Sequence, residues 1–393
     1  MLISSKKFRL ILVFSGIVLL IFILIINLNI KQELVETVQD FFPYMEIQNL
    51  HIKGWEKELP RFEIFTKKAI MQNKDNIELL DIYDGKFYDD QKTSVFENIN
   101  AKKAKLNLRY KEVYLFNIIA LLSSPIYAEE NLTTIKSEKL KYDDRAKKAY
   151  LQGQTTIIQK ETTITTSYGI IDNKERTALF KEGFVMDKGE IFVSGQEMWL
   201  NLDKEHIKMM KNIHLTKYHE KESKRFEINC QFLEYFSKKQ EETLIFRDDV
   251  EIKQKGNVLK GGQGVYWEYK NQALISGNPI IYLNSPETLL TGDQKSSFIT
   301  KNSRLLLKAL KIDFEKEIMD FTGPVKLLQP DSTIIGDTGS YYFNKNIISL
   351  AGHILIKKNN QYLECDEIKI NLNNSIIEAS GNIISKMKVQ KKK

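Results

Sequence analysis

The chain has little of what enzymes and metalloproteins usually display. It holds only 2 cysteines, 5 histidines and 7 prolines in 393 residues. It lacks the GxxxxGK[ST] loop that holds ATP phosphates, and it lacks the GxSxG and HExxH motifs of hydrolases and metalloproteases. These absences predict a protein that is not an enzyme and that uses no cofactor.

The scarce metal-ligand residues are also badly placed for a site. Cys230 and Cys365 lie four steps apart in the repeat described below, about 19 Å even at one strand spacing per step. A disulfide needs Cα atoms within about 7 Å, so we expect both thiols to be unpaired. His206, His214 and His219 do not share one strand face at metal-ligand spacing, so the sequence predicts no metal site.

Acidic pairs give no better sign of catalysis. Adjacent strand residues point to opposite faces, so Asp143-Asp144 and Asp248-Asp249 cannot easily act on one substrate. Gly292-Asp293, Gly336-Asp337 and Cys365-Asp366 recur at equivalent positions, which indicates turn or strand-start chemistry. The net charge of +7 is compatible with an anionic partner, or with a lysine-rich solvated surface that has none.

An apolar run near the N-terminus is the first feature that is present. As a helix, residues 8–28 would be about 31 Å long, enough to cross a bilayer core. Lys6, Lys7 and Arg9 predict that the N-terminus stays in the cytoplasm and that the rest lies across the membrane. A cleaved signal peptide is the rival interpretation, but no small-x-small site follows the run.

A repeated strand pattern fills most of the remaining chain. Its clearest copy places Ile348, Leu350, Gly352, Ile354 and Ile356 on one face, the period of a half-buried strand with a central glycine. Further copies centre on Gly153, Asp248, Gly277, Gly323 and Gly381, with weaker ones near Gly183 and Lys211-Asn212.

The spacing of these copies predicts one stacked array. The steps 248–277, 323–352 and 352–381 are each 29 residues, whereas 277–323 contains an insertion expected within 295–307. A fixed period of this size is typical of units that cannot bury an apolar face alone. Within the array, 113–122 is either a buried strand or a helix, with its β-branched content favouring a strand, and Asp84-Gly85 predicts a hairpin.

The anchor and the array together resemble a known family. Phe62-Glu63-Ile64 leading to Lys68-Ala69, and the run Thr133–Tyr142 followed by Asp143, resemble lipopolysaccharide-transport proteins of the LptC type. Thr333–Asp337, then Tyr341-Tyr342, then Leu350-Ala351-Gly352 resemble OstA/LptA-type repeats, and Leu289–Asp293 repeats their opening. The chain is about twice the length of a usual LptC protein, which implies an LptC-like head with an LptA-like extension.

The resemblance implies a fold and an arrangement of domains. The fold class is all-β: an elongated, twisted β-jellyroll or solenoid-like array of OstA-type repeats after one transmembrane helix. The expected parts are a cytoplasmic N-terminus (1–7), an anchor (8–30), a linker (31–46), an LptC-like jellyroll (47–190) and continuous LptA/OstA-like repeats (191–390).

It also implies a function and partners. Acyl chains of lipopolysaccharide or a similar lipid would lie in an apolar groove of a single-pass inner-membrane protein whose bulk is periplasmic. Expected partners are an ABC transporter of the LptB/LptF/LptG type, which would hydrolyse the ATP, and an LptA-like bridge or LptD-type translocon, with no nucleic acid. The alternative is a structural or adhesive β-solenoid at the membrane; an enzyme on a β-helix is a remote third.

Candidate residues follow from the repeat and from its two ends. The expected groove residues are Phe246, Val250, Ile275, Ile281, Phe321, Val325, Leu350, Ile354 and Ile383, which could equally pack the two sheets together. The expected partner-binding edges are Phe62, Ile64 and Ile70 at the N-terminal end and Ile377 and Ile384 at the C-terminal end.

Overall fold

The computed structural model describes residues 45–387, apart from 57, 72, 74, 90–91, 123–132, 203, 205, 219–225, 239–240, 255, 284–301, 360 and 375. The predicted anchor and nearly all of the predicted linker lie outside the described residues, as do His219 and Leu289–Asp293. Over the described ranges, no helix has the length and apolar character needed to cross a membrane.

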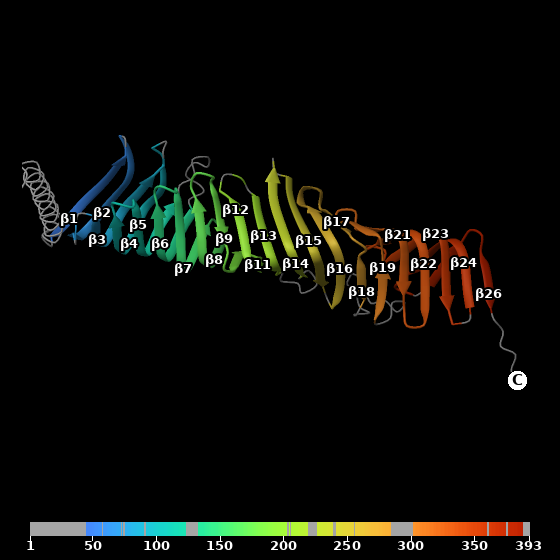
Figure 1. Ribbon diagram of the computed structural model, residues 1–393. Coiled ribbons are helices and arrows are strands. Elements are labelled where there is room, and N and C mark those ends of the chain that lie inside the picture. The colour runs from blue at the N-terminus through green and yellow to red at the C-terminus, as the bar shows by residue number, and fades with distance from the viewer. Residues whose placement is uncertain are drawn as a thin grey trace, which may run out of the picture.

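The described chain consists of strands laid side by side along one long axis (Figure 1). The N-terminal strands are β1 (Met45–Glu56), β2 (Leu59–Met71), β3 (Asn76–Tyr88), β4 (Ser94–Asn107), β5 (Glu112–Leu122), β6 (Thr133–Asp143), β7 (Lys148–Gln159) and β8 (Thr162–Asp172). The middle of the array holds β9 (Thr177–Phe180), β10 (Phe184–Lys188), β11 (Ile191–Gly195), β12 (Glu197–Asn201), β13 (His206–Lys217), β14 (Phe226–Lys238), β15 (Glu241–Gln254), β16 (Asn257–Trp267) and the 3-10 turn η2 (Glu268–Lys270).

The C-terminal part continues the same pattern. Its strands are β17 (Gln272–Ser276), β18 (Ile280–Leu283), β19 (Ser303–Leu306), β20 (Ala309–Asp313), β21 (Ile318–Leu328), β22 (Ser332–Tyr342), β23 (Ile347–Lys358), β24 (Gln361–Asn371), β25 (Ile376–Ser380) and β26 (Ile384–Met387). The predicted elongated all-β fold is confirmed.

The 29-residue period corresponds to a pair of antiparallel strands. Within the repeats, successive long strands such as β22, β23 and β24 pair as hairpins, so one repeat adds two strands to the sheet. This hairpin order differs from the parallel coils of a β-helix. Residues 113–122 lie in β5, which confirms a strand there. The extra residues of the long step lie between β18 and β19, mostly outside the described residues, while the end of the predicted insertion is β19 itself.

Each long strand bends near its middle, and the bends form a line along the array. Pairs of consecutive residues with positive φ occur at these bends: Lys211-Asn212, Asp248-Asp249, Gly277-Asn278, Gly352-His353 and Gly381-Asn382. The hydrogen-bond register shifts beside them, as in a β-bulge, which bends a strand and increases its twist. We call this line the fold line.

Gly352 shows why glycine is favoured at the fold line. Its φ is +77°, and a Cβ there would lie 2.6 Å from the carboxylate of Asp337. Asp and Asn tolerate the same conformation better than other side chains, which explains Asp248 at the equivalent position. The sequence pattern placed these residues at the centre of a strand, and the structure adds that the strand bends there. Asp84-Gly85 likewise lies in a bulge within β3, so the predicted hairpin is wrong.

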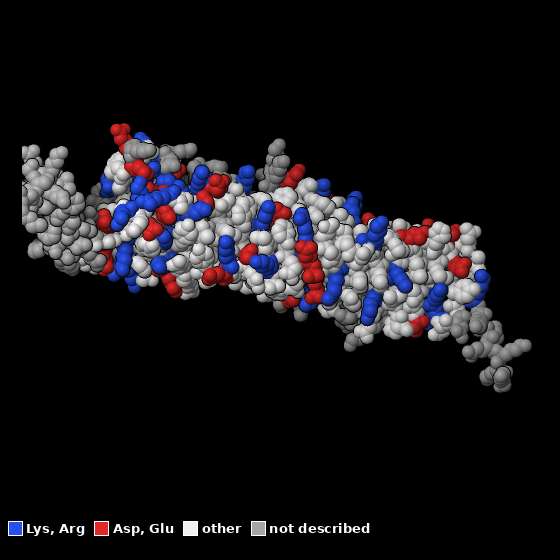
Figure 2. All heavy atoms as spheres, viewed as in Figure 1, with Lys and Arg blue, Asp and Glu red and all other residues white. Residues whose placement is uncertain are grey.

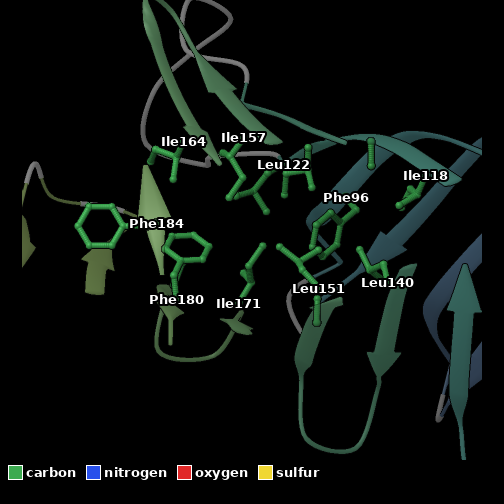
Figure 3. Packing of buried hydrophobic residues seen from close by; sticks show 14 of the residues in the cluster. Phe96, Ile118, Leu122, Leu140, Leu151, Ile157, Ile164, Ile171, Phe180 and Phe184 are labelled. Carbon is green, nitrogen blue, oxygen red and sulfur yellow. The ribbon is translucent and has the colours of Figure 1, made fainter. Parts of the chain in front are cut away.

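The bend folds the sheet onto itself in two layers. Figure 3 shows Leu151 and Ile157, both from β7, projecting from opposite layers toward the interior. Ile164 and Ile171 of β8 do the same. We call A the layer that contains Leu151 and Ile171, and B the layer that contains Ile157 and Ile164. Shorter strands divide at the fold line: β9, β12, β17, β20 and β25 lie in A, and β10, β11, β18, β19 and β26 lie in B.

Over the described residues, the chain passes from one layer to the other at the fold line. On the opposite side, turns such as 143–148 and 268–272 end layer A, and turns such as 159–162 and 254–257 end layer B. The ladder pairs of the described strands run within each layer and not between these two rows of turns. We call this the open side.

The buried core follows the interior from end to end in two clusters. One extends from Ile64 to Val250 and the other from Leu259 to Leu372, while Ile252 and Tyr266 contact both. The predicted domain boundary between 190 and 191 stays a prediction. Charged side chains gather most densely over the N-terminal end of the face in Figure 2 and thin out toward the C-terminal end.

Candidate functional site

The predicted groove residues line the interior beside the fold line. Phe246, Ile275, Phe321 and Leu350 belong to one continuous cross-strand file in layer A. Val250, Ile281, Val325 and Ile354 face them from layer B, and all eight side chains are at most 4% exposed. Ile383 is 55% exposed, because no further repeat covers the last strands. The structure thus brings eight of the nine together as deep core residues.

Aromatic residues in this deep region lie over glycines of the neighbouring strand. The directly opposed pairs are Phe62/Gly54, Phe180/Gly169, Phe184/Gly195, Phe246/Gly264 and Phe321/Gly339. In four of them, a Cβ added at the glycine would lie within 3.0 Å of the opposed ring, and at Gly339 the corresponding distance is 3.2 Å. The missing side chain therefore provides the space that the ring occupies. The repeat frame gave no sign of these glycines, since they are off its centre; only a Phe–Gly match across strands could have found them.

A second file in layer A, again a row of inward-facing residues paired from strand to strand, changes in its exposure to solvent along the array. Near the N-terminus it contains Ala149, Ile171 and Ala178, each at most 2% exposed. From β12 to β16 every member is half-buried, and the file then becomes buried again at Ala273. These half-buried members, which we call the window file, are Leu200, Ile207, Tyr235, Leu244 and Tyr266. Apolar side chains that face inward reach solvent at this place, on the open side.

The N-terminal end is closed instead. Tyr142 of layer A stacks on Phe87 of layer B with ring centroids 4.6 Å apart, and Phe96 of layer B meets Tyr142 edge-on. All three are at most 2% exposed. Because these rings come from opposite layers, their contacts fill the interior and hold the layers together.

Ion pairs cross the open side above those rings. Glu56, at the end of β1 in layer B, pairs with Lys111 in a layer A turn and with Arg61 at 3.0 Å. Arg61 of layer B also lies 3.9 Å from Asp144 of layer A, which pairs with Lys147 at 2.6 Å. The hydrogen bond from Lys111 is the main cause that lowers the pKa of Glu56. We call Glu56, Arg61, Lys111 and Asp144 the clasp.

The two ends of the sheet differ from the predicted edges. Phe62, Ile64 and Ile70 lie in β2, which is paired with β1 on one side and β3 on the other, so their assignment to an edge is wrong. The edge strand is β1, which pairs only with β2 among the described strands. At the other end, Ile377 and Ile384 lie in the edge strands β25 and β26 and are 38% and 47% exposed.

The remaining candidate residues have structural surroundings. Cys230 and Cys365 are free and buried, and burial raises the pKa of Cys230 to about 11. His206 contacts Glu234 at 2.8 Å, and His214 contacts Asn229 at 2.7 Å. No group of three or more metal-ligand side chains occurs in the part of the chain that the structure describes.

The recurring aspartates take up two structural positions. Asp143 accepts hydrogen bonds from the backbone of Arg145 and Ala146 at the start of a turn. Asp337 and Asp366 lie in the middle of β22 and β24, so the turn or strand-start position expected for them is wrong. They lie at the fold line, where His353 contacts the first at 2.7 Å and Asn382 donates to the second at 2.9 Å. Both contacts recur one repeat apart, so these acids stabilise the bend.

Comparisons with known proteins find similarity among solved structures. No family model matches the chain, and no curated protein matches it. The chain is similar to the crystal structure of LptH, the LptA-homologous periplasmic component of the conserved lipopolysaccharide transport device from Pseudomonas aeruginosa. The identity is 18%, the match covers 27% of this chain and 74% of that chain, and the TM-score is 0.25. A score this low leaves function to be argued from the chain's own residues.

Proposed function

We propose that this chain is a membrane-anchored bridge that carries lipopolysaccharide or a related lipid along its interior. The proposal rests above all on the unbroken inward-facing files of apolar residues. In layer A one file passes from Leu151 through Phe246 and Phe321 to Ile368 without a charged member. Shielding acyl chains in such an interior is worth about 0.8 kcal/mol for each buried methylene.

The predicted anchor and the two free edges complete the proposal. Residues 8–30 would hold the chain in the inner membrane with its bulk in the periplasm. Edge strand β1 would then lie near the membrane and accept a strand from the periplasmic part of an ABC transporter of the LptB/LptF/LptG type. The exposed edge at β25 and β26 would accept an LptA-like bridge or an LptD-type translocon.

One observation favours a second candidate, a structural β-array that carries no lipid. The deep residues beside the fold line are as buried as an ordinary core, so in this state they pack against each other. The window file favours transport, because its apolar side chains face inward and are half-exposed. A lipid conduit requires that the layers separate enough to admit acyl chains beside the deep file.

Photocrosslinking in living cells tests the proposal. A photoreactive residue is placed at Phe321, Leu350 or half-buried Ile356, with the exposed neighbour Lys357 as control. Lipopolysaccharide adducts at the inward sites and none at Lys357 would support the conduit. Adducts at no inward site, in a protein shown to be folded and anchored, would favour the structural array.

A further inference from the structure

The rim of layer B carries two lysines at inward-facing positions. Lys188, Ile191, Lys217 and Phe226 are consecutive cross-strand partners from β10 to β14. Each is two residues beyond a buried inward-facing residue of its own strand, namely Met186, Val193, Leu215 and Ile228 in that order. Because strand side chains alternate, the four belong to the inward face at its outermost level. Lysines at such positions are unexpected in a rim that only has to cover a core.

The opposite rim carries two glutamates at equivalent positions. Glu242 is two residues beyond Leu244 of the window file, again at an inward-facing strand position. Glu268 is two residues beyond Tyr266, at the start of the turn η2 on the same rim. A hydrogen bond to Glu242 is the main cause that raises the pKa of Glu268, while Lys217 and Lys188 lower it. Both lysines belong to the rim of layer B and both glutamates to the rim of layer A, so the two pairs lie on opposite rims of the open side, above the window file.

A buried amide lies where the closed end meets this opening. Asn173 follows Asp172 at the end of β8 and is 8% exposed. Among the described residues, neither its side-chain oxygen nor its side-chain nitrogen has a hydrogen-bond partner. It is two residues beyond the inward-facing Ile171, so it occupies the rim level of layer A. Buried amides without partners are rare, and a bound molecule is one of the usual reasons for them.

We propose that the open side between β10 and β16 is a lateral binding site for an acylated amphiphile with a phosphate head group. The tails would lie against the window file and Ile252, and the phosphate would lie at Lys188 and Lys217. This inference rests on the proposed function, and it adds a particular place and a head-group chemistry to it.

Charge explains why the head group would bind on one rim. Two ammonium groups that alternate with Ile191 and Phe226 along the rim offer a phosphate charge-assisted hydrogen bonds beside an apolar surface. Glu242 and Glu268 repel a phosphate from the layer A rim, so the ligand is oriented with its anion toward layer B. The side-chain amide of Asn173 can donate a hydrogen bond to, or accept one from, an amide or hydroxyl of the same head group.

The test uses the purified full-length protein and two pairs of photoactivatable lipids with diazirine-bearing acyl chains. One pair is phosphatidic acid and the matched diacylglycerol, which differ only in the phosphate. The other is an acylated glucosamine disaccharide with and without its phosphates, so the pairs separate a phospholipid from a phosphorylated glycolipid. We expect adducts on β15 and β16 with the phosphorylated member of at least one pair, and roughly tenfold weaker binding of its dephosphorylated partner.

Matched variants isolate the two rims. Lys188→Gln with Lys217→Gln should weaken binding of the phosphorylated lipid about tenfold, whereas Glu242→Gln with Glu268→Gln should strengthen it severalfold. Lys208→Gln with Lys311→Gln removes the same charge from outward-facing positions of layer A and should leave binding unchanged. If this control variant loses as much binding as the rim-lysine variant, the effect comes from net charge alone and the proposed site is overturned.

The remaining outcomes separate this inference from the conduit. One outcome is that adducts form at Phe321 and Leu350 without a phosphate preference and that none form on β15 and β16. This result would overturn the lateral site and leave the conduit standing. Adducts at no inward position would overturn both. Binding that is the same for each phosphorylated and dephosphorylated pair would overturn the head-group assignment.

Discussion

The N-terminal end and the middle of the array have the same strand architecture, but the open side is covered at the N-terminal end and exposes the interior in the middle. Between β1 and β8, aromatic rings from both layers stack in the interior and the clasp joins the two rims. Between β10 and β16, the equivalent apolar file is half-exposed, and the rim of layer B carries two lysines while the rim of layer A carries two glutamates. The two regions therefore differ in the side chains that fill the interior and line the rims, while the repeated strand frame stays constant.

The largest expected difference between the two regions concerns packing. Leu115→Ala in β5 removes a fully buried side chain and should destabilise the protein by about 2–5 kcal/mol. Leu244→Ala in the half-buried window file should cost about half as much, because less apolar surface returns to water. Urea unfolding of both variants measures the two costs. Equal costs would mean that the middle is as tightly packed as the N-terminal end.

A smaller effect is expected when an alanine replaces a glycine that lies under an aromatic ring. Its size depends on the steric overlap and on whether the ring can move away. A Cβ at Gly264 would lie 2.1 Å from the ring of Phe246, and one at Gly169 would lie 2.8 Å from Phe180. Phe246 has half-buried neighbours and can shift toward the open side, whereas Phe180 is enclosed. We therefore expect Gly169→Ala to cost about 1–3 kcal/mol and Gly264→Ala less, despite its shorter distance. The opposite order in urea unfolding would show that overlap alone decides.

Breaking the clasp should have a weaker and more local effect. Lys111→Gln removes the contact with Glu56 and should cost at most about 1 kcal/mol, since such partly exposed pairs contribute little. We expect faster amide hydrogen exchange at the ends of β1 and β5. Because salt screens ion pairs, about 1 M salt should produce the same increase in the unchanged protein. Lys103→Gln, which breaks a 2.7 Å pair with Glu78 within layer A, is the control and should leave those amides unchanged.

The smallest expected effect is a contrast in pH dependence. Glu268 has a raised pKa, so its destabilising charge is present at neutral pH and is lost as the pH falls through its folded-state pKa toward 4.5. Glu112, whose pKa is lowered chiefly by a hydrogen bond from Lys141, contributes stability above 4.5 that is lost as the pH falls below it. From pH 7 to about 5, the middle should therefore gain stability while the N-terminal end does not change.

Tryptophan fluorescence can follow this contrast during urea unfolding. Trp199 and Trp267 report on the middle, and Trp55 reports on the N-terminal end. Glu268→Gln should abolish the gain at the middle and leave the N-terminal response as it was. A gain that persists in this variant would assign the pH response to another group.

The sequence was sufficient to predict the repeat but not the depth of each residue. Alternation correctly assigned Ile348, Leu350 and Ile354 to the interior, because the period of a strand is strict. It could not show that Leu244 is half-buried while Phe246 is buried, since both have the same parity. Depth depends on the distance from the fold line and on the opposite layer, neither of which a single strand reveals.

Contacts between layers were also beyond the sequence pattern. Tyr142 and Phe87 come from strands 55 positions apart in the chain, and no local pattern announces that their rings stack. Ile383 fits the repeat frame as well as Ile354 does, yet it is exposed because the array ends there. Phe62 was placed at an edge by resemblance, whereas strand β1 precedes it and covers β2.

The repeat of two strands also fixes how the length of this molecule can change. About twenty strand positions at ~4.8 Å give an axis of roughly 100 Å. Losing or gaining one 29-residue unit, such as 323–351, would alter that length by about 9.6 Å and leave every turn on its own rim. Half a unit would exchange the rims of all later strands and would place their lysines and glutamates on the wrong sides. The length of the array can therefore change in evolution only in steps of about 1 nm, one two-strand repeat at a time.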